Sequence, residues 1–231
     1  MDAKRIVIKV GSSTLTGDAG TSLNGSAVTK LVDVVARLKG QGKEVIIVTS
    51  AAIAAGMAPL GLTQRPTDLA TQQASASVGQ GLLIAKYSAE FTRHNIVASQ
   101  VLVTGDDLAR DLHKENAKRT LLRLLELGVV PIINENDSVG TEEIRLGDND
   151  RLAALVLQLI GADLLVLVSD IDALYDAPPT QAGANRIAKV KNFADLAKIE
   201  IGGVGSSGVG SGGMVTKIQA AEIATSSGAA C

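Results

Sequence analysis

Five short apolar runs, rich in valine and isoleucine, recur along the chain. They lie at residues 5–10, 44–49, 96–103, 129–133 and 164–168. Segments with a helical repeat of apolar residues alternate with them or follow them, at 26–39, 78–91, 117–127, 151–160 and 214–224. Gly40 ends the first segment, while Gly128 and Gly161 stand just past the third and fourth, where a left-handed cap is expected. This alternation predicts an α/β fold, with one mainly parallel sheet sandwiched by helices.

The composition agrees with a single domain of this class, spanning residues 1–231. Hydrophobic residues make up 46% of the chain but aromatic residues only 2%, so aliphatic side chains must fill the interior. A net charge of −2 and the scarcity of aromatic residues argue against a nucleic-acid surface.

Other features exclude further classes of protein. No apolar run approaches the roughly 18 residues of a membrane span, and Lys4-Arg5 leads into a strand rather than a signal peptide. The single cysteine, Cys231, is the last residue, which excludes an internal disulfide and a cysteine-based metal site. We therefore expect a cytoplasmic protein that does not contact membranes.

Small, polar or acidic residues follow each of the five apolar runs. Ligands of open α/β sheets bind beyond the carboxyl ends of the strands, so a site is expected there. Solvated loops would be polar too, but five such ends together favour a site. These positions are 11–13, 49–52, 104–107, 134–137 and 169–172.

Lys9 interrupts the first apolar run, where a parallel strand should be apolar. An edge strand or a side chain that reaches solvent would explain it simply. The functional interpretation is a cation at the strand end, above a glycine turn whose amide groups can face a phosphate.

Two further segments carry polar chemistry next to predicted helices. Residues 148–150 read Asp-Asn-Asp, and one of them is enough to cap a helix. The others could bind an ammonium group, with Asp137 nearby in sequence, or orient lysines. The glycine-rich tract 202–213 has the simple interpretation of a surface loop, but it places Lys217 in the first turn of the next helix.

Two known phosphate-binding motifs are absent. The only Gly-Lys pair, Gly42-Lys43, precedes Glu44, which excludes a Walker loop, and no His-Arg-Asp catalytic loop occurs. A Gly-x-Gly-x-x-Gly spacing at 203–208 leaves a nicotinamide-dependent oxidoreductase as an alternative, although such a tract yields this spacing by chance.

The two histidines, His94 and His113, lie near expected helix ends and offer no persuasive general base. A reaction whose nucleophile is already an anion needs none. Attack of a carboxylate on the γ-phosphate of ATP is such a reaction. It requires positioning and positive charge, which Lys9, Lys217, Mg²⁺ and backbone amides would supply.

Seven segments together carry a resemblance to a known family. They are 6–13 (IVIKVGSS), 48–56 (VTSAAIAAG), 73–80 (QASASVGQ), 131–137 (PIINEND), 146–150 (LGDND), 169–175 (SDIDALY) and 211–221 (SGGMVTKIQAA). They resemble the amino acid kinase family, and within it the kinases that phosphorylate the side-chain carboxylate of glutamate. The resemblance implies the amino acid kinase fold, with ATP and Mg²⁺, and an acyl phosphate product on the way to proline.

The resemblance also implies roles by position. Lys9 and Lys217 match the lysines that stabilise the transferring phosphoryl group, and Asp150 matches the aspartate that organises them. The implied substrate-binding residues are Ser50, Asp137 and Asn149. The implied ATP-binding residues are Lys9, Gly11, Ser169, Asp170, Ser211, Gly212, Gly213, Met214, Val215, Thr216 and Lys217. No metal ligand is directly assignable.

The chain departs from the family pattern at two points. Ala51 stands where the family has glycine. The chain also ends soon after the Lys217 segment, whereas family members continue into a further strand and helix and many add an RNA-binding-like domain. We therefore expect a shortened kinase domain without that addition.

Other kinases of the same fold are the nearest alternatives, acting on acetylglutamate, carbamate or a nucleoside monophosphate. A non-catalytic nucleotide-sensing module is another. The acids at Asp137 and 148–150 favour a substrate with a free ammonium group, which those substrates lack. Family members are typically homo-oligomers, so we expect a dimer or tetramer, with L-glutamate as substrate and proline as a possible feedback inhibitor.

Overall fold

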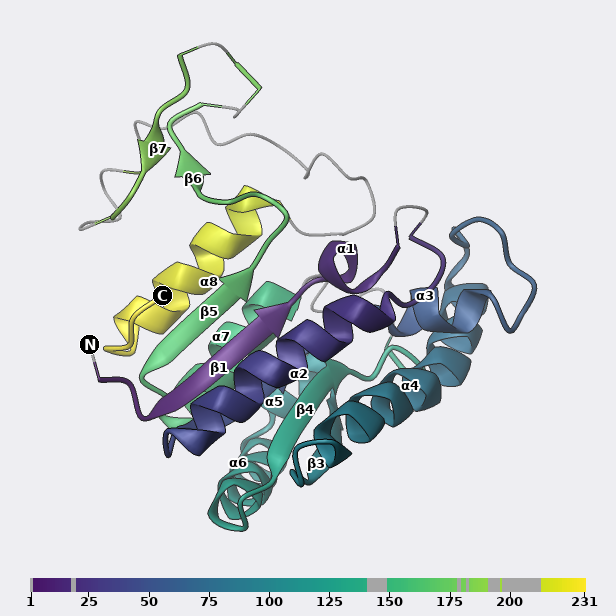
Figure 1. Ribbon diagram of the computed structural model, residues 1–231, viewed down its shortest axis with the longest axis horizontal. Coiled ribbons are helices and arrows are strands. Elements are labelled where there is room, and N and C mark those ends of the chain that lie inside the picture. The colour runs from purple at the N-terminus through teal and green to yellow at the C-terminus, as the bar shows by residue number, and fades with distance from the viewer. Residues whose placement is uncertain are drawn as a thin grey trace.

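A five-stranded parallel sheet forms the centre of the protein (Figure 1). The computed structural model describes residues 2–17, 20–140, 149–177, 180–181, 183–190, 196 and 213–231. The strands are β1 (Arg5–Val10), β2 (Glu44–Val48), β3 (Ala98–Val103), β4 (Val130–Glu135) and β5 (Leu164–Val168). Their order is β3-β4-β2-β1-β5, and every neighbouring pair is parallel, so all carboxyl ends meet at one edge.

Helices cover both faces of the sheet, as the sequence predicts. The first face carries α2 (Gly25–Gly40), α3 (Ala52–Met57) and α4 (Leu69–Thr92). The second carries α6 (Asp111–Glu126), α7 (Asn149–Ile160) and α8 (Met214–Ser226). The remaining elements are the short helices α1 (Ser12–Leu15) and α5 (Gly105–Ala109) and an antiparallel pair, β6 (Leu174–Tyr175) and β7 (Arg186–Ile187). Among the described helices, none is long and apolar enough to cross a membrane.

Side chains alternate between two separate cores along each strand. In β1, Ile6, Ile8 and Val10 pack under α2 and α4. Val7 packs on the opposite face, under α7 and α8. Lys9 is the next residue on that second face, so the pleat alone directs it toward α7 and α8.

The predicted strands are confirmed more closely than the predicted helices. β1 and β5 have the predicted bounds, β2 and β3 differ by one or two residues at one end, and β4 differs by one residue at its start and two at its end. Gly128 (φ 75°) and Gly161 (φ 60°) are left-handed, as expected after their helices. The helix start predicted at residue 78 is wrong, because α4 begins at Leu69, where the Asp68 carboxylate caps the N–H of Thr71 at 2.8 Å.

Helices α3 and α4 approach each other closely through two glycines. A Cβ on Gly56 would lie 1.9 Å from the carbonyl oxygen of Ser75. One on Gly79 would lie 1.8 Å from the carbonyl oxygen of Ala52. No side chain fits between the two backbones, so this contact fixes α3, and with it the turn that leaves β2.

Gly79→Ala should therefore lower the free energy of unfolding by about 2 kcal/mol or more, because the methyl group must push α3 away from α4. Urea unfolding followed by circular dichroism measures the change. Gly81→Ala is the matched control, since nothing lies within 4 Å of a Cβ on that exposed side of α4. It should stabilise the helix by about 0.5–1 kcal/mol. Similar effects of the two substitutions would contradict the close packing.

Candidate active site

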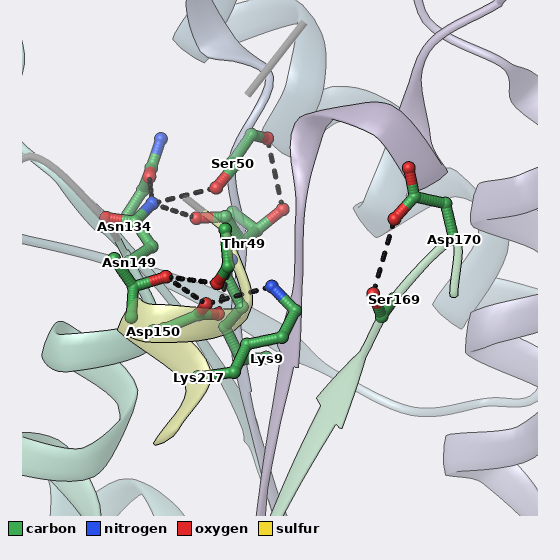
Figure 2. Close-up of polar contacts among 11 residues, drawn as sticks. Lys9, Thr49, Ser50, Asn134, Asn149, Asp150, Ser169, Asp170 and Lys217 are labelled. Atoms are coloured by element: carbon green, nitrogen blue, oxygen red, sulfur yellow. Dashed lines mark hydrogen bonds and ion pairs between the residues drawn. The ribbon is translucent and has the colours of Figure 1, made fainter. Parts of the chain in front are cut away.

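Asp150, at the start of α7, lies between two lysine side chains at the carboxyl edge of the sheet (Figure 2). Its side chain is fully buried. The Nζ atom of Lys9 lies 2.6 Å from Oδ1, and the Nζ atom of Lys217 lies 3.0 Å from Oδ2. The three residues come from β1, α7 and α8, so the fold brings together the trio that the sequence nominated separately.

The position of Lys9 decides between the two interpretations of this residue. β1 lies between β2 and β5, and Lys9 is only 4% exposed. The alternatives of an edge strand and of a side chain reaching solvent are therefore wrong. A buried ammonium group is costly unless it is paired, and Asp150 provides the pairing.

The cluster of Lys9, Asp150 and Lys217 carries more positive than negative charge. Two ammonium groups share one carboxylate, and the Thr216 hydroxyl lies 3.2 Å from Oδ2 of that carboxylate. Gly11 borders the cluster, since a Cβ built on it would lie 3.6 Å from Nζ of Lys9. The excess positive charge favours an anion such as phosphate at this edge.

A second, uncharged network adjoins the cluster through Asn149, the residue before Asp150 (Figure 2). Nδ2 of Asn149 donates to the carbonyl oxygen of Thr49 at 2.5 Å, to Oγ of Ser50 at 3.0 Å and to Oδ1 of Asn134 at 2.9 Å. Nδ2 of Asn134 in turn donates to Oε1 of Gln80 at 2.7 Å. The predicted substrate residues Ser50 and Asn149 are thus in direct contact.

Sequence reasoning assigned no role to Asn134 or Gln80. Both are buried, Asn134 to 1% exposure and Gln80 to 9%. The sequence places Asn134 in the polar stretch that follows the apolar run 129–133, whereas β4 continues to Glu135 and includes it. The Thr49 hydroxyl also approaches the Tyr87 hydroxyl at 3.0 Å, and burial raises the pKa of Tyr87, so this phenol stays protonated.

The other nominated residues lie on two sides of β1. Asp137 is half-buried in the turn after β4, and Gln73 of α4 ties that turn down by donating to the carbonyl oxygen of Gly140 at 3.0 Å. Ser169 and Asp170 follow β5, across the β1 ribbon from Ser50 (Figure 2).

The glycine-rich segment is only partly described. Ser211 and Gly212 lie outside the described residues, as does the spacing at 203–208. Gly213 caps α8, whose first turn contains Met214, Val215, Thr216 and Lys217. The structure therefore places the end of this segment, but not its beginning, beside Asp150.

Ala51 has left-handed backbone geometry, with φ 77° and ψ 13°. It follows Ser50, caps α3 and is 6% exposed. An alanine in this conformation costs roughly 1–2 kcal/mol. Ala51 therefore does not begin α3 in right-handed geometry, and the left-handed backbone is the reason why glycine suits this position.

The comparison with known proteins agrees with this geometry. The model of the amino acid kinase family matches residues 4–230. The chain belongs to the amino acid kinase family. The matched region includes residues 203–208, so the glycine spacing there occurs within a kinase family and does not indicate a nicotinamide-binding enzyme.

Similar relatives are named glutamate 5-kinase. That of Streptomyces coelicolor is 58% identical over 227 residues, covering 98% of this chain and 60% of the relative. That of Salinispora arenicola is 59% identical over 226 residues, covering 98% and 61%. That of Leifsonia xyli subsp. xyli is 53% identical over 228 residues, covering 99% and 83%. The chain thus spans about 60% of the length of the first two relatives.

Ala51→Gly should raise the free energy of unfolding by about 1 kcal/mol, because glycine adopts the left-handed backbone without strain. Thermal melting followed by circular dichroism measures the shift. Ala74→Gly is the control, since Ala74 is exposed in the right-handed helix α4. It should destabilise by about 1 kcal/mol. Destabilisation by both substitutions would show that Ala51 carries no strain.

Proposed function

We propose that this chain contains the catalytic site of a kinase that transfers the γ-phosphoryl group of ATP to the side-chain carboxylate of L-glutamate, the first step of proline biosynthesis. The observation that carries the proposal is the buried cluster of Lys9, Asp150 and Lys217 at the carboxyl end of β1. The relatives named glutamate 5-kinase support the same reaction.

The cluster suits the charge changes of this reaction. A glutamate side chain is ionised at neutral pH, so it attacks the γ-phosphorus without a general base. One oxygen–phosphorus bond forms, the bond from the γ-phosphorus to the β–γ bridging oxygen breaks, and ADP leaves. Lys9 and Lys217 would stabilise the charge on the transferring group. Asp150 would position both ammonium groups without contacting the substrate.

The strand order supports a division of the site into two halves. β1 and Lys9 lie between β2 and β5. Ser50, Asn149 and Asp137 are on the β2 and β4 side, where the acceptor would bind. Ser169, Asp170 and residues 213–217 are on the β5 and α8 side, where ATP would bind. Transfer would then occur at the end of β1, next to Lys9 and Gly11.

Mg²⁺ would accompany ATP and neutralise charge on its phosphate oxygens. Among the described residues, no group of three or more histidine, cysteine, aspartate or glutamate side chains could hold a metal ion. In kinases, Mg²⁺ is usually bound by one or two carboxylates together with the nucleotide phosphates.

The polar residues of the acceptor half favour an amino acid with a free ammonium group over an acylated amino acid as the substrate. We infer that Asp137 and Asn149 receive the α-ammonium group of L-glutamate, which acetylglutamate, carbamate and nucleoside monophosphates lack. We also propose that residues 1–231 act as one catalytic domain, that copies of the chain assemble as a dimer or tetramer, and that proline inhibits the reaction.

L-Glutamate should support ADP release far better than acetylglutamate, because the analogue leaves a half-buried polar subsite without its ammonium partner, at a cost of about 1–3 kcal/mol. A coupled assay with each acceptor, and with none, measures the difference. Equal rates with glutamate and acetylglutamate would reject the assigned acceptor. ADP release independent of any acceptor would reject the kinase itself.

Lys217→Ala should lower kcat by on the order of 10²-fold or more, with a smaller effect on the KM for ATP, because its charge acts mainly on the transferring group. Circular dichroism checks that the variant folds. Lys114→Ala, an exposed lysine of α6, is the control and should keep wild-type kinetics. A near-normal kcat in Lys217→Ala would remove this lysine from the proposed mechanism.

A further inference from the structure

Gly11, the residue after β1, has a backbone conformation that does not require glycine. Its φ of −83° and ψ of 167° are extended values that any residue adopts. Beyond the chain neighbours of Gly11, a Cβ built on it would lie within 4 Å of only two atoms of the described residues. They are Nζ of Lys9 at 3.6 Å and Oγ of Ser13 at 3.9 Å, both at ordinary contact distance. Neither backbone strain nor close packing therefore explains a glycine at this position.

The contrast with Gly56 and Gly79 shows the difference from a packing glycine. A Cβ on those residues would lie 1.9 Å or 1.8 Å from a backbone oxygen of the facing helix. A methyl group on Gly11 would only occupy the space between an ammonium group and a hydroxyl group. The glycine thus leaves room for a ligand atom without being needed for the fold.

Ser13 provides the hydroxyl group on one side of this space. It is half-buried in α1, which lies at the tip of β1 (Figure 1). Within the described part of the chain, its hydroxyl has no hydrogen-bond partner. The ammonium group on the other side, that of Lys9, is held in place by Asp150 at 2.6 Å. A hydroxyl donor and a fixed cation beside the same space favour an oxyanion there.

We propose that Ser13 is a catalytic residue of the phosphoryl transfer, whose hydroxyl donates a hydrogen bond to the transferring group in the space beside Gly11 and Lys9. The inference rests on the proposed function, because it assigns Ser13 a role in that reaction. Ser13 keeps its proton throughout, and the bonds that form and break remain those of the γ-phosphorus. As a neutral donor, the hydroxyl orients the group, while the two lysines stabilise its charge.

A purely structural role for Ser13 makes a different prediction. α1 has only four residues, Ser12–Leu15, and a serine could serve simply to shape this turn. Loss of such a role would lower the melting temperature and weaken nucleotide binding in general. Loss of a contact with the transferring group would lower kcat and leave the affinity for ADP unchanged, because ADP lacks that group.

The test measures the affinity for ADP by titration calorimetry of the full chain with Mg²⁺ and L-glutamate, with and without aluminium fluoride. ADP with aluminium fluoride imitates the phosphoryl group during transfer, so wild type should bind it more tightly than ADP alone. In Ser13→Ala this gain from aluminium fluoride should fall by about tenfold or more. The kcat for ADP release should fall by about tenfold to a hundredfold, with an unchanged melting temperature.

Three further variants separate the hydroxyl from the turn. Ser13→Thr keeps the hydroxyl and should retain most of the gain from aluminium fluoride. Gly11→Ala fills the space with a methyl group, so it should lower the gain without lowering the melting temperature, because its backbone suits alanine. Ser26→Ala changes an exposed serine of α2 and is the control, which should behave like wild type.

Each remaining outcome has a distinct meaning. An unchanged gain or an unchanged kcat in Ser13→Ala would overturn the inference. A lowered gain accompanied by weaker ADP binding and a lowered melting temperature would assign Ser13 to the turn and overturn it as well, as would a wild type without any gain. A wild type that shows the gain but releases no ADP from ATP with glutamate would reject the proposed function and leave the oxyanion contact of Ser13 standing.

Discussion

The buried carboxylate of Asp150 is the interaction on which the site depends. Lys9 is 4% exposed in an interior strand of the sheet, where an unpaired ammonium group would be too costly to keep. Asp150 offsets that cost and also holds Lys217. Because the three side chains belong to β1, α7 and α8, the second core must bring both helix starts to the carboxyl edge before the charges can meet.

The location of β1 places this ion cluster between the two half-sites of the proposed function. A residue on an edge strand would have neighbours on one side only, whereas β1 has β2 on one side and β5 on the other. Groups from β2, β4 and α7 therefore approach Lys9 from one direction, and groups from β5 and α8 from the other. Under the proposed function, this arrangement would let each of the two substrates reach the same charge without displacing the other.

How well each element could be predicted depends on whether it is determined by the local sequence pattern or by contacts between distant parts of the chain. β1 and β5 were predicted at their bounds because both are continuous apolar runs, and the burial of β1 on both faces also made Lys9 conspicuous. The extent of helix α3 was not predicted, because six alanine-rich residues show no period and the place of the helix depends on Gly56 and Gly79 meeting across space. The hydrogen bonds that link Asn149, Asn134 and Gln80 were missed for a similar reason, since such amide contacts depend on how strands and helices align.

There is a physical reason why the cluster around Asp150 is charged while the adjoining network of amide side chains is neutral. Asn149 adjoins Asp150 in sequence, and Asn134 lies one hydrogen bond further away. A carboxylate at Asn149 could hold an ammonium group too, but it would also pair with the lysines and neutralise the charge that phosphoryl transfer requires. A neutral amide held in one orientation provides an acceptor without adding charge. Under the proposed function, Asn149 would receive the amine while the adjacent Asp150 positions the two lysines, and neither role would weaken the other.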